Sequence, residues 1–207
     1  MTRLHSQQGD SVSLSRLCRN GSRAAVTGLA RVLLGRRPEL PWISYDAQPV
    51  LARHLAPRSQ VLEFGSGMST LWYARHAGSV FSLEDDPAWF GQVAKSLPAN
   101  AEVRLATTLR DYLTFPERAY DLVMVDGVPD WRPDCVEAAL PFLAPGGIFY
   151  LDNSDWPHAA ESVRMIMAYA RTHGCETRRF VDFAPTQMFV QEGLLMRRPA
   201  PNEAPRG

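Results

Sequence analysis

The sequence predicts a doubly wound α/β domain with a seven-stranded, mostly parallel sheet and an antiparallel hairpin at its C-terminal end. From residue 46 onward, short apolar runs alternate with segments of helical periodicity, as in successive βαβ units. The runs "VLEF", "LVMV" and "IFYL" are apolar without alternation, which is typical of strands covered by helices on both faces. The last two extended segments have no helix between them, so they are expected to form a hairpin with one strand antiparallel.

The expected elements follow in chain order. Helices are predicted at 46–56, 69–77, 87–97, 108–113, 133–143 and 158–174, and strands at 59–65, 79–84, 101–106, 120–127, 148–153, 176–184 and 187–198. Pro87 suits the first turn of its helix, and Gly174 suits the position just past the end of the last helix. The stretch "APGG" ends the helix before the fifth strand, and "PTQ" lies near the hairpin turn.

The chain totals favour one globular domain with a terminal arm. The 207 residues are 45% hydrophobic, and 22 basic residues balance 22 acidic ones. No basic excess points to a nucleic-acid partner, and no apolar run is long enough for an integral membrane segment. The three cysteines are widely spaced without a CxxC pair, so a reducing, cytoplasmic location is expected.

Three regions differ in composition. Residues 1–40 form a basic arm, 41–197 the folded domain, and 198–207 a Pro-rich tail that is expected to be flexible. The arm is rich in Arg and Ser, as in a mitochondrial transit peptide or a basic amphipathic helix on a membrane or partner. We favour a partly disordered arm followed by an ordinary helix over 23–34, with a homodimer or peripheral contact through the arm.

The stretch "VLEFGSGMST" at residues 61–70 is the first candidate for a binding site. Gly65 and Gly67 let a ligand approach the bare backbone between a buried strand and a helix N-terminus, which attracts polar ligands. The alternative is a tight turn with Ser69 or Thr70 as the N-cap. The loop reads G-x-G-x-x-T, so the third glycine of a dinucleotide fingerprint is missing.

Acidic or small polar residues stand at the carboxyl end of every predicted strand from the first to the fifth. Ligands of open α/β sheets bind beyond this edge, and like charges gathered there without a ligand would repel one another. Glu84 follows the glycine loop by about twenty residues, where an acid accepts ribose hydroxyls. The alternative is a solvated acid that caps the next helix, a task that Asp85 or Asp86 also suits.

The motifs "VLEFGSGMST", "FSLEDDPAW", "YDLVMVDG" and "LAPGGIFYLDN" resemble those of the class I S-adenosylmethionine-dependent methyltransferases. The resemblance covers about residues 40 to 195 and implies a Rossmann-like methyltransferase fold. It places the glycines at the methionyl portion, Glu63 at its ammonium group, Glu84 at the ribose and Thr107 beside the adenine. The cofactor-binding residues that it implies are Glu63, Gly65, Ser66, Gly67, Ser69, Glu84, Asp85, Thr107 and Asp126.

Asp126, Asp152 and Asn153 resemble the acidic cluster of metal-dependent small-molecule O-methyltransferases, such as the catechol and macrolide-sugar types. Two carboxylates and an amide suit Mg²⁺, which would lower the pKa of a bound hydroxyl. The alternative is that Asp126 only orients the substrate and that Asp152 and Asn153 cap a helix. The catechol type has a lysine where this chain has Pro129, so the base is expected among Asp126, Asp130 and His158.

The sequence therefore predicts methyl transfer to a small-molecule oxygen, with S-adenosylmethionine and possible help from Mg²⁺. The alternatives are an N-methyltransferase, another S-adenosylmethionine-using transferase, or a catalytically silent nucleotide-binding module. A dinucleotide oxidoreductase is disfavoured by Thr70 at the third glycine position. Arg132 is expected to hold an anionic substrate or to pair with Asp130 or Asp134. Four aromatic residues are candidates for a lid over the acceptor: Trp42, Tyr45, Trp131 and Trp156.

Overall fold

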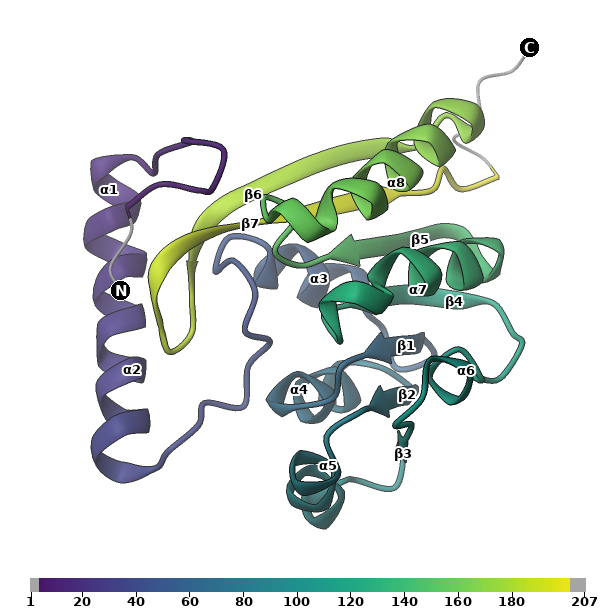
Figure 1. The fold of residues 1–207 in the computed structure, drawn as a ribbon, viewed down its shortest axis with the longest axis horizontal. Helices are drawn as coiled ribbons and strands as arrows, with labels where there is room; N and C mark the ends of the chain where they lie inside the picture. The colour runs from purple at the N-terminus through teal and green to yellow at the C-terminus, as the bar shows by residue number, and fades with distance from the viewer. Residues whose placement is uncertain (1–3, 202–207) are drawn as a thin grey trace.

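Seven strands form one sheet in the order β3-β2-β1-β4-β5-β7-β6 (Figure 1). The computed structural model describes residues 4–201. The strands are β1 (Gln60–Phe64), β2 (Ser79–Glu84), β3 (Ala101–Leu105), β4 (Tyr120–Val125), β5 (Leu143–Leu151), β6 (Glu176–Ala184) and β7 (Gln187–Arg197). The first five are parallel, and β7 runs antiparallel to both β5 and β6. The predicted fold class, with its closing hairpin, is confirmed.

Helices cover both faces of the sheet, as the unbroken apolar strands predict. The helices that follow the arm are α3 (Gln48–His54), α4 (Met68–His76), α5 (Pro87–Val93), α6 (Leu109–Tyr112), α7 (Arg132–Ala139) and α8 (Ala160–His173). Val61 of β1 packs in a core with α3 and α4, whereas its neighbour Leu62 packs in a core with α6, α7 and α8. Successive side chains of a strand thus point into opposite cores, which explains why the residues on both faces of the strand are apolar.

The fifth strand begins earlier than predicted. The helix expected at 133–143 ends at Ala139, and a 3₁₀ turn over Leu140–Phe142 leads directly into β5. Leu143 pairs with Tyr120 of β4, so main-chain pairing across the sheet overrides the local helical pattern. At the other end, Arg198 donates from its main-chain nitrogen to Gly147 O at 2.9 Å, so the predicted flexible tail is tied to the sheet at its start. Residues 202–207 of that tail lie outside the described residues.

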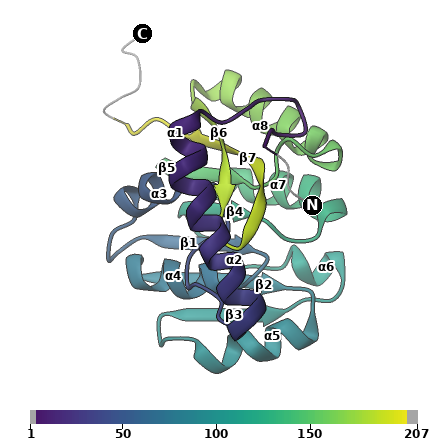
Figure 2. The same ribbon diagram turned by 90° about the vertical axis from the view of Figure 1, so that its left-hand side faces the viewer.

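The N-terminal arm contains a longer helix than predicted. It runs through α1 (Leu14–Arg16), a π turn (Leu17–Gly21) and α2 (Ser22–Leu34), and lies on the side toward which β1, β2 and β5 point (Figures 1 and 2). Asn20 Nδ2 donates to Asp182 Oδ2 on β6 at 2.5 Å, and Thr27 Oγ1 accepts from Thr186 N in the hairpin turn at 2.8 Å. These long-range contacts order the arm, contrary to the partly disordered segment that composition suggested.

One face of α2 stays uncovered. Val26, Leu29 and Leu33 lie three and four residues apart and are each more than half exposed. The predicted homodimer or peripheral contact through the arm stays a prediction. No helix among residues 4–201 is long and apolar enough to cross a membrane.

Candidate active site

The two glycines of the loop between β1 and α4 differ in backbone conformation and in the space around them. Gly65 has φ +94°, and a Cβ there would lie 2.8 Å from Gly127 N, because the loops after β1 and β4 touch at this point. Gly67 is extended, with φ 176°, and a Cβ there would meet nothing nearer than Ser69 Oγ at 3.7 Å. Gly65 is therefore required by the fold itself, whereas a Cβ at Gly67 would make only ordinary contacts, with Ser69 Oγ at 3.7 Å and the Trp89 ring at 3.8 Å.

Glu63 supports this loop from below. Its side chain is fully buried, and its carboxylate accepts hydrogen bonds from the hydroxyls of Ser69, Thr70 and Ser82, each at 2.5 Å. Burial raises the pKa of Glu63 to about 7, although the three hydroxyls oppose the shift. Glu63 does not line the pocket described below, and its three hydroxyl partners make it a support of the loop; its expected contact with an ammonium group stays a prediction.

Glu84 joins the end of β2 to the glycine loop. Its Oε2 accepts from Ser66 N at 3.0 Å and Ser66 Oγ at 2.8 Å, and its Oε1 accepts from Asp86 N at 3.0 Å. The side chain is only 4% exposed, and burial raises its pKa. Asp86, rather than Glu84, caps α5 by accepting from Ala88 N and Trp89 N. Glu84 thus lines the pocket while holding its floor in place.

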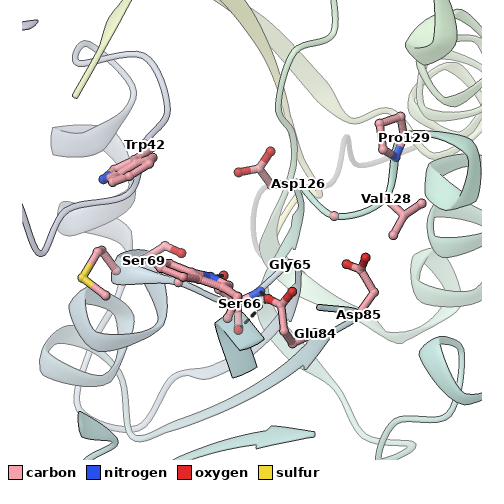
Figure 3. A pocket seen from close by; sticks show the side chains of 13 residues that line it. Trp42, Gly65, Ser66, Ser69, Glu84, Asp85, Asp126, Val128 and Pro129 are labelled. Atoms are coloured by element: carbon pink, nitrogen blue, oxygen red, sulfur yellow. Dashed lines mark hydrogen bonds between the residues drawn. The ribbon is translucent and has the colours of Figure 1, made fainter. Parts of the chain in front are cut away.

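A pocket with a volume of about 430 Å³ opens at this edge of the sheet (Figure 3). Its lining comes from the glycine loop, the ends of β2 and β4, and two indoles; it comprises Trp42, Gly65, Ser66, Gly67, Met68, Ser69, Glu84, Asp85, Trp89, Asp126, Gly127, Val128 and Pro129. The structure therefore brings seven of the nine predicted cofactor residues together. Glu63 lies beneath them, and Thr107 is exposed outside the pocket because the chain turns into α6 at Thr108.

Both indoles are held by other parts of the chain. Trp89 Nε1 donates to Ser66 O at 2.8 Å, and the Arg37 guanidinium lies 4.4 Å from the Trp89 ring. The Arg31 guanidinium of α2 lies 4.8 Å from the Trp42 ring. Cation–π contacts thus connect the basic arm to the two aromatic walls of the pocket. Of the four aromatic residues predicted to form a lid, Trp42 lines the pocket, whereas Tyr45, Trp131 and Trp156 do not.

Asp126 is the carboxylate at the end of β4, and its side chain is 37% exposed toward the pocket. Arg132 stands behind it, 4% exposed, with Nη2 3.3 Å from Asp126 Oδ1. Burial raises the pKa of Asp126, while the Arg132 guanidinium opposes the rise. The expected partner of Arg132 was Asp130, Asp134 or a substrate anion; the structure gives it Asp126 instead.

Asp152 and Asn153 follow β5 but do not line the pocket. Asp152 is 2% exposed, and its two carboxylate oxygens lie 3.3–3.4 Å from Gln191 Nε2 on β7. Asn153 Nδ2 donates to Gln191 Oε1 at 3.3 Å. Burial and the nearby Asp126 raise the pKa of Asp152 well above its ordinary value. This donor set does not fit the predicted magnesium ion, because only Asp126 faces the pocket and a guanidinium already lies against it.

The other two predicted bases lie outside the pocket. Asp130 is exposed in a short 3₁₀ turn (Pro129–Trp131), and His158 is half-buried beside Trp156 in another (Pro157–Ala159). Burial lowers the pKa of His158, and the nearby Arg132 acts in the same direction. Among the predicted catalytic residues, Asp126 alone lines the cavity.

Sequence reasoning missed Trp89 as a wall of the pocket. Its signal was its place in the first turn of the helix after Glu84 and Asp85, which directs it back over the strand end. The contacts of Arg31 and Arg37 had no local signal, because they join segments far apart in the chain.

Comparisons with known proteins agree with this geometry. Residues 62–154 match the family model described as a methyltransferase domain. An O-methyltransferase from Bacillus cereus in complex with SAH is 18% identical, with a TM-score of 0.61 over 86% of this chain and 98% of that one. The O-methyltransferase TomG from Streptomyces achromogenes, involved in tomaymycin synthesis and bound to SAM, is 17% identical, with a TM-score of 0.57 over 86% and 90%.

The same fold also serves other substrates. An rRNA methylase from Streptococcus thermophilus is 16% identical, with a TM-score of 0.60 over 75% of this chain and 95% of that one. No curated protein sequence matches the chain.

Proposed function

We propose that the chain is a class I S-adenosylmethionine-dependent methyltransferase that methylates a small-molecule acceptor at oxygen, because residues 62–154 match a methyltransferase domain and the fold matches that of solved O-methyltransferases. The observation that carries this proposal is the Asp126 carboxylate, which faces the pocket next to the glycine loop and is fixed from behind by Arg132. A fixed carboxylate is a strong hydrogen-bond acceptor, and a hydroxyl is a donor that matches it.

The cofactor fits the side of the pocket formed by β1, β2 and α4. Gly67 lines the pocket without a side chain, so a ligand can lie directly against the backbone there, beside Trp89. Glu84 and Asp85 stand at the end of the neighbouring strand, where carboxylates suit ribose hydroxyls. Trp89 closes over the loop through its bond to Ser66 and offers a flat apolar wall.

When bound, S-adenosylmethionine supplies a methyl group on a sulfonium centre, whose carbon–sulfur bond breaks as the acceptor oxygen bonds to the carbon. The remaining work of the protein is alignment, which is the main contribution to such a transfer. Asp126 accepts the hydrogen bond of the acceptor hydroxyl, orients its lone pair, and takes up the proton as the new bond forms. The proton then passes to solvent, since Asp126 is open to the pocket.

The charge of the pocket favours a small neutral or cationic acceptor over a nucleic acid. Glu84, Asp85 and Asp126 all line it, and their carboxylates repel a phosphate backbone. The same acids also suit an amine, so N-methylation is the second candidate. We retain the cytoplasm as the expected location.

Labelled transfer tests the proposal. The protein is incubated with S-adenosylmethionine that carries a tritiated methyl group, together with either a low-molecular-weight metabolite extract or total RNA. We expect label in a small molecule whose mass spectrum shows an O-methyl group, with a rate at least tenfold lower in Asp126→Asn. Asp130→Asn is the matched control, because its carboxylate is exposed outside the cavity. Label in RNA alone, or on nitrogen, contradicts the proposal.

A further inference from the structure

The ends of β4 and β5 lie side by side, and a buried guanidinium links them. The register Val125–Leu151 places Asp126 and Asp152 at adjacent strand ends. Arg132 begins α7, immediately after the loop that leaves β4. Its side chain folds back beneath that loop and is 4% exposed.

Arg132 makes hydrogen bonds to both strand ends. Nε donates to Gly127 O at 3.1 Å, and Nη1 donates to Asp152 O at 2.6 Å. Nη2 donates to Asp126 O at 3.2 Å and to Asp126 Oδ1 at 3.3 Å. A buried charge persists only where it is paired and hydrogen-bonded, and these four contacts meet that requirement.

Of the three predicted metal ligands, Asp126 alone lines the pocket. The Asp152 carboxylate faces Gln191, and the Asn153 amide faces the same side chain. Neither residue lines the cavity that contains Asp126. A divalent ion placed at Asp126 would also stand beside a permanent positive charge, because arginine does not deprotonate in proteins.

We propose that the Arg132 guanidinium provides the positive charge that a divalent ion would otherwise supply, so that this site binds no metal. Arg132 is a positioning residue: it fixes the Asp126 carboxylate from behind and leaves its free face to the acceptor. The absence of a metal site stands by itself, whereas the effect on turnover rests on the proposed methyl transfer.

Manganese binding tests the first part without an acceptor. Free Mn²⁺ is measured by electron paramagnetic resonance as MnCl₂ is added to the full chain with S-adenosylhomocysteine. We expect less than about one tenth of an ion bound per chain at 100 µM Mn²⁺, with no change in melting temperature on adding EDTA. One Mn²⁺ bound per chain and lost in Asp126→Asn overturns the proposal. If S-adenosylhomocysteine itself does not bind, the proposed function fails instead.

Substitution of Arg132 tests the second part. Arg132→Gln should lower turnover at least tenfold in EDTA while changing S-adenosylhomocysteine affinity less than threefold, and Arg132→Lys should recover part of the loss. Arg164→Gln is the matched control, because Arg164 pairs with Glu161 on an exposed face of α8. Unchanged turnover in Arg132→Gln overturns the positioning role. If that variant does not fold, turnover in Arg132→Lys still tests the positioning role: a rate equal to that of the native chain overturns it. The manganese titration on the native chain tests the absence of a metal site in either case.

Discussion

Replacement of the two glycines of the β1–α4 loop by alanine, one at a time, should have opposite effects on the free energy of unfolding. At Gly67 the new Cβ meets protein atoms no nearer than 3.7 Å, and φ 176° is accessible to alanine. The free energy of unfolding should therefore stay level or rise by up to ~1 kcal/mol, because alanine restricts the unfolded chain. The added methyl group occupies the space proposed for the cofactor, so S-adenosylhomocysteine affinity should fall at least tenfold, or about 1.4 kcal/mol.

At Gly65 the same substitution should lower the free energy of unfolding. The Cβ would lie 2.8 Å from Gly127 N at a φ of +94°. Roughly 1–3 kcal/mol is expected from the strained backbone, and overpacking adds about 1–3 kcal/mol. A loss of binding in this variant would therefore say little about the ligand.

Thermal and urea unfolding, with calorimetric titration of S-adenosylhomocysteine, measure both quantities. Gly91→Ala in α5 is the matched control, because a Cβ there has nothing within 4 Å. It should leave affinity unchanged. A stable Gly67→Ala that binds within twofold of the native affinity would refute the placement of the cofactor on this loop.

Two further predictions concern the buried acids. The pKa of Glu63 is about 7 in the folded protein, against an ordinary value of 4.5, so the folded state binds more protons between these two pH values. The free energy of unfolding therefore falls by about 3 kcal/mol as the pH rises through this window. Urea unfolding at pH 5 and at pH 8 measures this loss in the native protein, and the loss should be smaller by that amount in Glu63→Gln. An equal change in the free energy of unfolding in both proteins would contradict the prediction. Glu84→Gln should lower S-adenosylhomocysteine affinity at least fivefold and also the melting temperature, because Ser66 and Asp86 lose part of their acceptor; unchanged affinity at a lower melting temperature would make Glu84 purely structural.

The sheet was predictable because its signals are local. Apolar runs and Gly or Pro breaks identify the strands, and parallel strands place their carboxyl ends at one edge. The acids at these ends could therefore be assigned to one site before the structure was known. The start of β5 at Leu143 could not, since it depends on pairing with Tyr120.

The differences between the expected and the observed site follow from side-chain direction. Glu63 shares the orientation of Val61, toward α3 and α4, so strand alternation directs it beneath the loop rather than into the pocket. Asp152 and Asn153 turn toward Gln191, a residue almost forty positions later in the chain. Sequence spacing gives no information on such a partner, and the same holds for Arg132 between two strand ends.

The proposed methyl transfer requires that the pocket beyond β1, β2 and β4 binds S-adenosylmethionine. Isothermal titration of the native chain with S-adenosylhomocysteine measures this binding, with NAD⁺ titrated separately as the alternative ligand. We expect one site per chain with a dissociation constant in the micromolar range, about −8 kcal/mol, and no heat from NAD⁺. Binding of NAD⁺ without any response to S-adenosylhomocysteine would contradict it.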